Sequence, residues 1–488
     1  MTAGEELDHR AHRLLSEAAQ VYRDDGPSGT WLRRHLERLD EPLQLAVIGP
    51  PGAGKSTLVN ALMGEDLAPA TVAGEARLFT RYHDGPQPRA RLCPSWGEPY
   101  DVPLVRTGPG LELAAGMGDA GMGVGPEIDE AIVDWPCRVL RRTELIDTPG
   151  LMPDQDGEQL VQLAFEEADA ILYLTRHLGA PDLRFLQLAR GDRGAAAVGV
   201  QVMIVLSHGD ETSGGRPDAL LAAKQIARRR RRDPRIAPLC QDVLATSPLI
   251  AQAARTLRDE EYEVIAALAD LAKTAVEPHL LSADRFTAGD FGVPITSERR
   301  ARLLDRLGLG GVRLAVTLVR AGSRSRTVLA QALLRYSGLS ELQASVADLF
   351  TDQRATLKAR SALIGLDQLL RAEPRPQSAH LVAELERLVA GAHEFRELRL
   401  LAALRTGRVT LPAEQAVDAR RLVGGYGTSA GERLGTAADA PAAEIWSQAH
   451  AAAARWRQEA QRPGQPPGQR RTAEVVLRSC TGILARLS

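Results

Sequence analysis

A glycine-rich segment near the start of the chain has the residue types and spacing of a phosphate-binding loop. It reads Gly49-Pro50-Pro51-Gly52-Ala53-Gly54-Lys55-Ser56 and continues into Thr57. Glycines let backbone N–H groups turn toward a phosphate, and the positive end of the following helix adds to the attraction. In such a loop the lysine reaches the β- and γ-phosphates and the serine hydroxyl ligates Mg²⁺. The sequence therefore predicts that Gly49, Gly52, Ala53, Gly54, Lys55, Ser56 and Thr57 bind a nucleotide and that Lys55 and Ser56 also serve catalysis.

A second segment, Leu145-Ile146-Asp147-Thr148-Pro149-Gly150, has the form of a loop that senses the γ-phosphate. We expect Asp147 to hold Mg²⁺ through water and the Gly150 N–H to bond the γ-phosphate. That bond would re-aim the loop when the phosphate leaves. Alone, the segment could be an ordinary turn after a strand. Together with the glycine loop it predicts a nucleoside triphosphatase.

A third segment, Ser207-His208-Gly209-Asp210, follows an apolar run at the place where a base-reading motif belongs. A carboxylate only accepts hydrogen bonds, so Asp210 can take both the N1–H and the N2 amino group of guanine. We therefore expect GTP or GDP, with Ser207 and His208 in the same loop. Further on, Ser247 could bring its backbone N–H to the guanine O6. The alternative for segment 207–210 is a polar loop after a core strand, and the signal at Ser247 is weak when taken alone.

These segments must be positioned by a sheet, and short apolar runs supply its strands. Runs at 43–48, 131–133, 144–146, 170–174 and 202–206 alternate with helical patterns, which predicts an α/β domain with a mostly parallel sheet and helices on both faces. Residues 108–125 are a glycine-rich loop, expected as a surface insertion. Residues 5–40 predict one or two amphipathic helices that break at Gly26-Pro27, and helical periodicity takes over after Pro294.

The resulting division has five parts. It comprises N-terminal helices over 1–40, a nucleotide domain over 41–278, an all-helical region over 279–461, a Pro/Gly linker over 462–470 and a last helix over 471–488. An arginine run, 228–232, closes the helix expected over 219–232, as a solvated helix end or as a contact to anionic lipid or a partner. Trp446 and Trp456 lie on one predicted helix, where core anchoring is favoured over membrane insertion.

Composition limits the partners and the compartment. The 488 residues carry a net charge of −2, so no global basic field implies nucleic acid. Four cysteines lie far apart, without metal or disulfide spacing, which fits a reducing cytosol. The polar, acidic start is unlike a secretory signal, and the longest apolar run, 195–206, is too short to span a bilayer. We expect a cytoplasmic protein whose membrane contact, if any, is peripheral.

With these motifs in this order, the chain resembles the bacterial dynamin-like GTPases, and among them the actinobacterial isoniazid-inducible-protein-like branch. Further likeness lies in segments 56–64, 205–211, 228–235 and 306–313, and the resemblance covers roughly residues 40–370. It implies a P-loop GTPase head on a helical neck and trunk, with the N- and C-terminal helices packed together in the neck. It also implies association through the heads and action on membranes in division or repair.

Two departures from the family pattern affect catalysis. The switch threonine that closes over Mg²⁺ is expected near residues 74–77, where none occurs; Thr71 and Thr80 flank the gap, and Thr71 is the first candidate. In the glycine loop, Pro51 and Gly52 stand where dynamins have polar residues. Both departures predict slow hydrolysis.

Two functions therefore compete. The first is a GTPase that self-associates and remodels or scaffolds the inner face of the bacterial membrane, at the division septum or in membrane repair. The second is an adaptor that binds GTP with little hydrolysis and forms a hetero-oligomer with an active dynamin-like partner. An assembly GTPase acting on RNA is disfavoured, because no basic module interleaved with aromatic residues appears.

Overall fold

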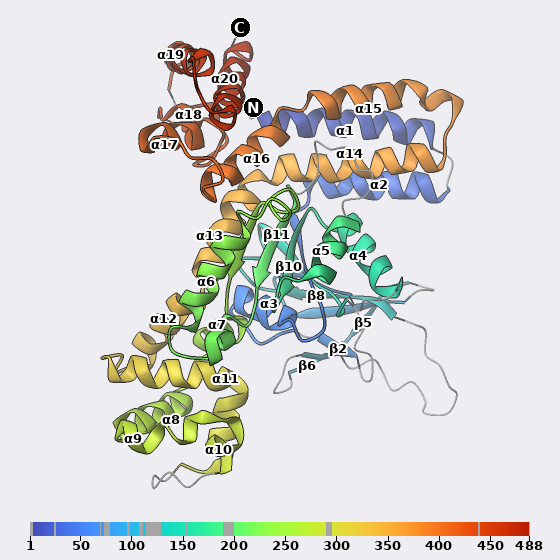
Figure 1. Cartoon of the computed structure of the whole chain (residues 1–488). Coiled ribbons are helices and arrows are strands. Elements are labelled where there is room, and N and C mark those ends of the chain that lie inside the picture. Colours follow the sequence, from blue (N-terminus) through green and yellow to red (C-terminus); the bar gives the residue numbers. More distant parts are fainter. Residues whose placement is uncertain are drawn as a thin grey trace.

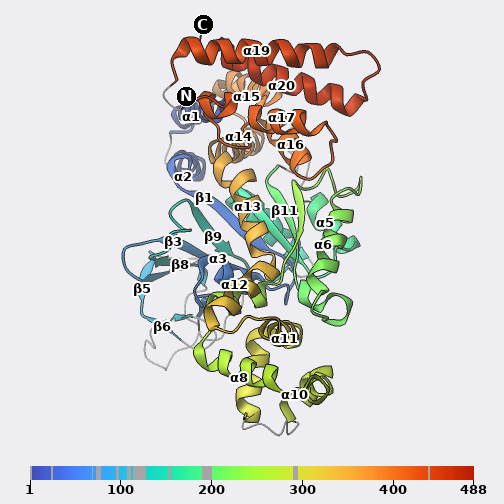
Figure 2. The same cartoon turned by 90° about the vertical axis from the view of Figure 1, so that its left-hand side faces the viewer.

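The computed structural model describes residues 3–23, 26–68, 70–72, 79–94, 98–106, 111–113, 128–151, 155–188, 200–288, 295–437 and 440–487. An α/β domain forms the middle of the molecule, and helices gather at its two ends (Figure 1). The view turned by 90° also shows the α/β domain between two groups of helices, and both labelled chain ends lie beside the same group (Figure 2).

A nine-stranded sheet forms the centre of the α/β domain, in the order β12-β11-β10-β1-β9-β3-β8-β4-β5. Strands β12, β11, β10, β1 and β9 are parallel, and β3 joins β9 antiparallel. This confirms the mostly parallel sheet. The strands are β1 Leu43–Ile48, β3 Phe79–Asp84, β4 Arg89–Pro94, β5 Tyr100–Val102, β8 Ile128–Trp135, β9 Thr143–Asp147, β10 Ala170–Thr175, β11 Val202–Leu206 and β12 Asp242–Ala245.

The antiparallel edge of this sheet was not fully expected from sequence. Strand β3 carries Arg81, whose buried guanidinium pairs with Glu130 and with Glu167 at 2.8 Å. Such buried charges conceal the apolar alternation by which strands are recognised. A second sheet, β2-β7-β6, consists of Ala70–Val72, Leu111–Leu113 and Leu104–Arg106. Strand β7 falls inside the expected glycine-rich loop, which corrects that expectation for residues 111–113; the remainder of 108–125 lies outside the described residues.

Helices cover both faces of the large sheet, as predicted. Alternate residues of β1 point to opposite faces: Leu43, Leu45 and Val47 join one core, whereas Ala46 and Ile48 join the other. The first core includes α3 Lys55–Met63, α7 Pro248–Arg255 and α13 Leu339–Leu349; the second includes α4 Gln155–Glu167, α5 Ala180–Leu188 and α6 Ala219–Arg230. Helix α13 belongs to the helical region, so that region completes the core of the α/β domain.

The helical region begins at one end of the molecule and returns to the other (Figure 1). Helices α8 to α11 lie below the sheet in this view, although α8 and α9 fall within the nucleotide domain expected over 41–278; they share one core with α10 and α11. Helices α12 and α13 run back along the domain, and the later helices lie above it. Their bounds are α8 Asp259–Asp270, α9 Lys273–Val276, α10 Ala283–Ala288, α11 Ser297–Arg320, α12 Arg326–Ser337, α14 Arg354–Ala372, α15 Ala379–Gly391, α16 Glu394–Arg405, α17 Ala413–Leu422, α18 Ala430–Leu434, α19 Ala442–Gln461 and α20 Pro467–Ala485.

The N-terminal helices α1 Ala3–Val21 and α2 Pro27–Asp40 pack on α14 and α15. Buried Lys358 of α14 fastens this bundle to the α/β domain, because its Nζ pairs with Asp169 at 3.0 Å and donates to the Arg38 carbonyl at 2.6 Å. Helix α20 packs on α19, α16 and α17 and reaches α1 through Arg486 and Glu6 at 3.4 Å. It begins at Pro467 rather than at residue 471.

The two tryptophans of α19 differ in burial. Trp456 is 3% exposed and donates through its Nε1 to Asp418 at 2.9 Å, whereas Trp446 is 46% exposed. Trp456 therefore anchors the core, and Trp446 does not. In the described part of the chain, no helix is both long enough and apolar enough to cross a membrane.

A buried histidine in α2 predicts a pH-dependent stability. Burial and the neighbouring Arg38 lower the pKa of His35 to about 4, and its ring stacks on Trp31 with 3.6 Å between centroids. Because the unfolded chain binds this proton first, stability falls as the pH drops from about 6.5 toward 4. We expect a loss of about 2 kcal/mol in the free energy of unfolding between pH 7 and pH 5. Denaturant titrations at both pH values measure it.

The matched variants are His35→Asn and His9→Asn, since His9 is exposed on α1. His35→Asn should flatten the pH dependence by that amount, and His9→Asn should leave it unchanged. Equal pH slopes for wild type and His35→Asn would contradict the assignment.

Candidate nucleotide-binding site

The glycine loop connects β1 to α3 and is shaped by its neighbours. Gly49 has φ 152°, and a Cβ there would lie 2.1 Å from the Leu174 carbonyl oxygen of β10. Gly54 has φ 85° and caps the start of α3. A side chain at Gly49 would collide with the next strand, and one at Gly54 would strain the left-handed backbone. The order of strand, glycine loop and helix is as the sequence predicts.

Lys55 begins α3 and turns back over the loop. Its Nζ donates to the carbonyl oxygens of Gly49 and Pro50, each at 3.2 Å. Burial lowers the pKa of Lys55, and the Asp147 carboxylate opposes that shift. The ammonium group thus lies inside the loop where a phosphate chain would be cradled.

Asp147 ends β9 and meets the start of α3. Burial raises the pKa of Asp147 to about 6, against a hydrogen bond from Ser56 and the charge of Lys55. Its buried Oδ1 has no hydrogen-bond partner among the described residues. A hard carboxylate oxygen without a partner, next to a serine hydroxyl, fits Mg²⁺, which takes few protein ligands and keeps waters and substrate oxygens. Ser56 and Asp147 would hold the ion, and the ion would neutralise charge on the phosphate oxygens.

The sensing segment touches the glycine loop directly. The Leu151 N–H donates to the Gly49 carbonyl at 3.0 Å. A Cβ on Gly150 would lie 2.7 Å from Cγ of Pro51, so the proline ring occupies the space beside Gly150. Pro51 has neither an N–H nor a polar side chain to offer at this point.

The base-reading loop follows β11 and also contacts the glycine loop. His208 has φ 56°, its Nε2 donates to the Gly52 carbonyl at 2.9 Å, and its Nδ1 lies 3.0 Å from Glu211. This histidine therefore joins the two loops, at the position where a lysine is usual in the motif. Ser207 extends the same loop, and its N–H donates to Thr175 at 2.9 Å.

Asp210 lies one turn further on, 9% exposed. Burial raises the pKa of its carboxyl group, and a hydrogen bond from the Ser247 hydroxyl opposes the shift. Ser247 thus orients the carboxylate that is expected to read guanine. The expected role of its backbone N–H is corrected: that group donates to the Ser337 carbonyl at 2.8 Å instead of pointing to a base.

Five of the predicted residues line one cavity of about 540 Å³: Gly52, Gly54, Thr57, His208 and Asp210. The cavity is not lined by the following predicted residues: Gly49, Ala53, Lys55, Ser56, Asp147, Gly150, Ser207 and Ser247. The cavity is also lined by residues of α11 that the sequence analysis missed as site residues, Gly308, Leu309, Gly310 and Arg313. Their signal was the group of glycines inside a helical pattern, where glycine is unfavourable unless packing requires it.

Helix α11 is shaped to approach the base-reading loop. Its backbone kinks at Gly308, with φ 65°. Arg313 then donates to the carbonyl oxygens of Gly214 at 2.8 Å and Gly215 at 3.0 Å. These contacts hold the helical region against the loop that follows Asp210.

A substitution at Gly310 tests whether α11 forms one wall of the nucleotide-binding cavity. A Cβ at Gly310 would lie 2.7 Å from the backbone oxygen of Asp210, so Gly310→Ala must displace the guanine-reading loop. We expect weaker binding of a fluorescent guanine nucleotide, because an added methyl group in a packed contact typically costs about 1–3 kcal/mol of folding stability and here displaces the loop that carries Asp210. Gly482→Ala in α20 is the control, because an added Cβ there meets no described atom within 4 Å. Unchanged affinity in Gly310→Ala would exclude α11 from the pocket wall.

The two candidate switch threonines have different surroundings. Thr80 is 3% exposed in β3 and pairs with Asp147 across the antiparallel ladder. Directly opposed residues project to the same face of a sheet, so Thr80 lies on the Asp147 side. The backbone of Thr71 lies in β2 of the small sheet, whereas its side chain and residues 74–77 lie outside the described residues.

Comparisons with known proteins find a GTPase family model and bacterial dynamin-like proteins. A family model described as a 50S ribosome-binding GTPase matches residues 44–203. A bacterial dynamin-like protein of Nostoc punctiforme is 25% identical over 146 residues, which are 27% of this chain and 20% of that protein. A solved structure of an oligomerised bacterial dynamin pair covers 99% of this chain and 74% of its own, with 13% identity and a TM-score of 0.35.

One likeness extends over nearly the whole chain. The isoniazid-induced protein IniC of Mycobacterium tuberculosis is 34% identical over 482 residues, which are 96% of this chain and 95% of that protein. It therefore includes the helical region as well as the candidate nucleotide-binding site.

Proposed function

Since the chain belongs to the bacterial dynamin-like proteins of the IniC type, we propose that it binds GTP in the cavity described above. It would self-associate through its GTPase head and remodel or scaffold the inner face of the bacterial membrane. Cell division or membrane repair would be the setting, and the protein would be cytoplasmic and peripheral.

The observation that carries the proposal is the meeting of two loops in one cavity. His208 Nε2 lies 2.9 Å from the Gly52 carbonyl, so the base-reading loop and the glycine loop are held together. GTP binding is implied by membership of a GTPase family. The wall contributed by α11 favours a mechanical function, because the helical region touches the site where nucleotide state would change.

A second function is favoured by one contact. Pro51 packs against Gly150 where a polar residue would be expected to help hydrolysis. A chain that holds GTP and hydrolyses it slowly could act as the adaptor subunit of a hetero-oligomer with an active dynamin-like partner. Turnover measured with and without liposomes, and with and without such a partner, separates the two functions.

Membrane contact is proposed at the turn between α19 and α20. Arg457, Arg462, Arg470 and Arg471 are exposed there. Two acidic residues lie nearby: Glu459, which pairs with Arg462 at 3.3 Å, and the exposed Glu474, one turn after Arg470 and Arg471. A basic side chain near an anionic surface contributes about 1 kcal/mol, and salt screens it. A local patch of this size can hold a protein of near-zero net charge on such a surface.

Liposome sedimentation at low and high salt tests this contact. We expect binding to anionic vesicles at low salt, its loss at high salt, and about a 30-fold or greater weakening by Arg470→Glu with Arg471→Glu. Arg184→Glu with Arg302→Glu is the control, since these exposed arginines lie on α5 and α11. Retention that ignores both salt and anionic lipid would contradict an electrostatic contact and point to apolar insertion.

A further inference from the structure

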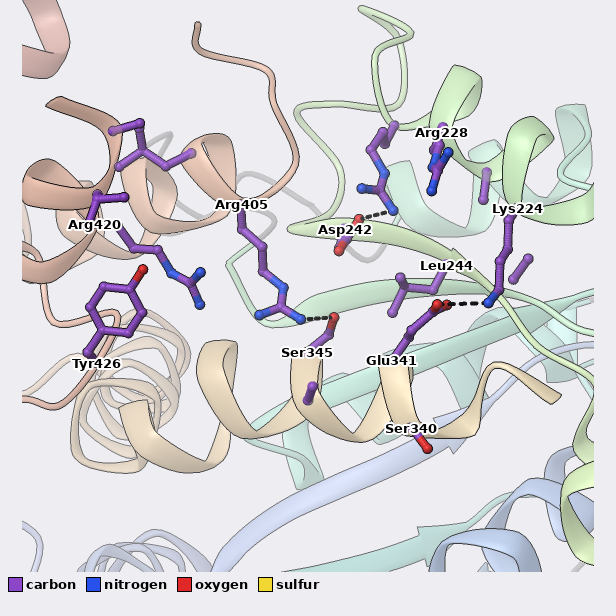
Figure 3. Close-up of a pocket in the computed structure, with 17 residues that line it drawn as sticks. Lys224, Arg228, Asp242, Leu244, Ser340, Glu341, Ser345, Arg405, Arg420 and Tyr426 are labelled. Atoms are coloured by element: carbon purple, nitrogen blue, oxygen red, sulfur yellow. Dashed lines mark hydrogen bonds and ion pairs between the residues drawn. The ribbon is translucent and has the colours of Figure 1, made fainter. Parts of the chain in front are cut away.

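A second cavity, of about 690 Å³, lies at the junction of the α/β domain and the helical region (Figure 3). Helix α6 and strand β12 form one wall, and α13, α16 and α17 form the other. It shares no described lining residue with the nucleotide-binding cavity. The two cavities are therefore separate sites.

Positive charge is in excess around this cavity. Five cationic side chains line it: Lys224, Arg228, Arg231, Arg405 and Arg420. Lys224 pairs with Glu341 at 2.8 Å and Arg231 with Asp242 at 3.2 Å, while Arg405 and Arg420 share Asp348. Five cations thus face three carboxylates, which leaves two positive charges uncompensated.

Arg228 has no ion pair within the part of the chain that the structure describes. It is exposed on α6, one residue from the exposed Arg229 that does not line the cavity. The residues of the arginine run therefore have different surroundings. Arg231 packs against β12 and donates to the Val243 carbonyl at 2.9 Å, whereas Arg228 faces the cavity.

The guanidinium groups near this cavity repel one another, and this repulsion affects the pKa of Arg231. Burial lowers the pKa of Arg231, and Arg228, Arg408 and Arg405 lower it further against the pull of Asp242. Arg408 does not line the cavity and donates to the Arg231 carbonyl at 2.8 Å. A bound anion would relieve this repulsion.

The cations approach from both walls. In Figure 3, Arg405 and Arg420 extend from the helical side toward the space that Arg228 and Lys224 face from the side of α6. Arg420 also lies over the ring of Tyr426, 4.6 Å from its centroid, which fixes the orientation of its planar head. Apolar surface is available beside it, because Tyr426 is 52% and Val417 56% exposed.

We propose that this cavity binds a small phosphate monoester, with the phosphate held between Arg228 and the pair Arg405 and Arg420, and the organic part against Val417 and Tyr426. A phosphate monoester carries about −1.5 to −2 at neutral pH, which matches the two uncompensated charges. Guanidinium forks bind phosphate oxygens in pairs. The cavity volume lies within the range of about 300–1,000 Å³ typical of small-molecule sites.

Such a ligand would bridge the two parts of the chain. It would contact α6 of the α/β domain and α16 and α17 of the helical region at once. Binding would therefore stabilise the folded junction by mass action. The phosphate ester could come from a water-soluble metabolite or from a lipid headgroup, and the experiment has one arm for each source.

In the first arm, glycerol 3-phosphate is titrated by calorimetry into the full-length protein, with glycerol as the neutral control. Arg228→Ala should weaken binding about tenfold or more, because a charge-assisted hydrogen bond is lost. Arg229→Ala is the matched control and should bind as wild type does. Lys55→Ala should also bind normally, which separates this site from the glycine loop. Because Arg228 is exposed and makes no ion pair with any described residue, Arg228→Ala should not lower the thermal midpoint of the unliganded protein.

In the second arm, sedimentation compares phosphatidylcholine vesicles with and without phosphatidic acid, which presents the same monoester. Loss of phosphatidic-acid-dependent sedimentation in Arg228→Ala but not in Arg229→Ala assigns the cavity to a lipid headgroup; an Arg228 effect in the first arm assigns it to a soluble ester. If Arg228→Ala matches wild type in both arms, or if neither probe binds, the proposal is overturned. Loss of binding in Lys55→Ala alone would also overturn it, since the glycine loop would then be the only phosphate site.

Discussion

Isolated protein is expected to hydrolyse GTP more slowly than a GTPase whose loops carry every transition-state donor. The rate should fall about 10²–10³-fold for each donor that is missing. Phosphoryl transfer depends on positioning the attacking water and on stabilising charge that spreads over the phosphoryl oxygens. Lys55, Ser56 and Asp147 can hold the phosphates and the metal ion. Pro51 and Gly52 supply no polar side chain, and the ring of Pro51 fills the space beside Gly150.

Single-turnover hydrolysis with protein in excess measures this rate, for the chain alone and with a co-purified dynamin-like partner. Pro51→Gln should raise the rate by up to about 10²-fold by restoring one donor. Pro50→Gln is the matched control on the neighbouring proline. Brisk turnover by the wild-type chain alone would refute the adaptor function. Thr71→Ala and Thr80→Ala would then identify the switch residue, with Thr80 favoured by its pairing opposite Asp147.

Loss of the Asp210 carboxylate should cost about 2–4 kcal/mol of guanine-nucleotide binding, if it makes two charge-assisted hydrogen bonds to the base. This corresponds to roughly 30- to 1,000-fold in the dissociation constant. Titration of fluorescent guanine and adenine nucleotides into Asp210→Ala measures both the loss and the selectivity. Weak adenine binding should stay as it is in wild type.

Asp218→Ala is the control for Asp210→Ala, since Asp218 is exposed shortly after the same loop. Ser247→Ala should have a smaller effect in the same direction, because its hydroxyl donates to Asp210 and would act on the base through that carboxylate. Equal affinity of the wild-type protein for guanine and adenine nucleotides would disprove the guanine assignment.

Local sequence sufficed for the parts of the site whose chemistry depends on backbone shape. An apolar run, a glycine loop and a helix start specify a phosphate loop wherever they occur in this order, because glycine at Gly49 and Gly54 permits backbone angles that other residues resist. The central strands were recognisable for a similar reason, since strands buried on both faces are continuously apolar. The antiparallel edge was less recognisable, because Arg81 is buried there with its carboxylate partners.

What the sequence by itself determined is the type of site: a glycine loop with Lys55 and Ser56, a sensing segment with Asp147, and a base-reading loop with Asp210, in the order of a GTPase. Tertiary structure alone decided what surrounds them. It brought Gly308 to Gly310 of α11 against Asp210, tied the Ser247 N–H to Ser337, and gathered cations from α6, α16 and α17 around one cavity. The physical reason is that local pattern sets backbone preference and the apolar face of each element, whereas contacts between residues far apart in the sequence depend on how those faces pack together.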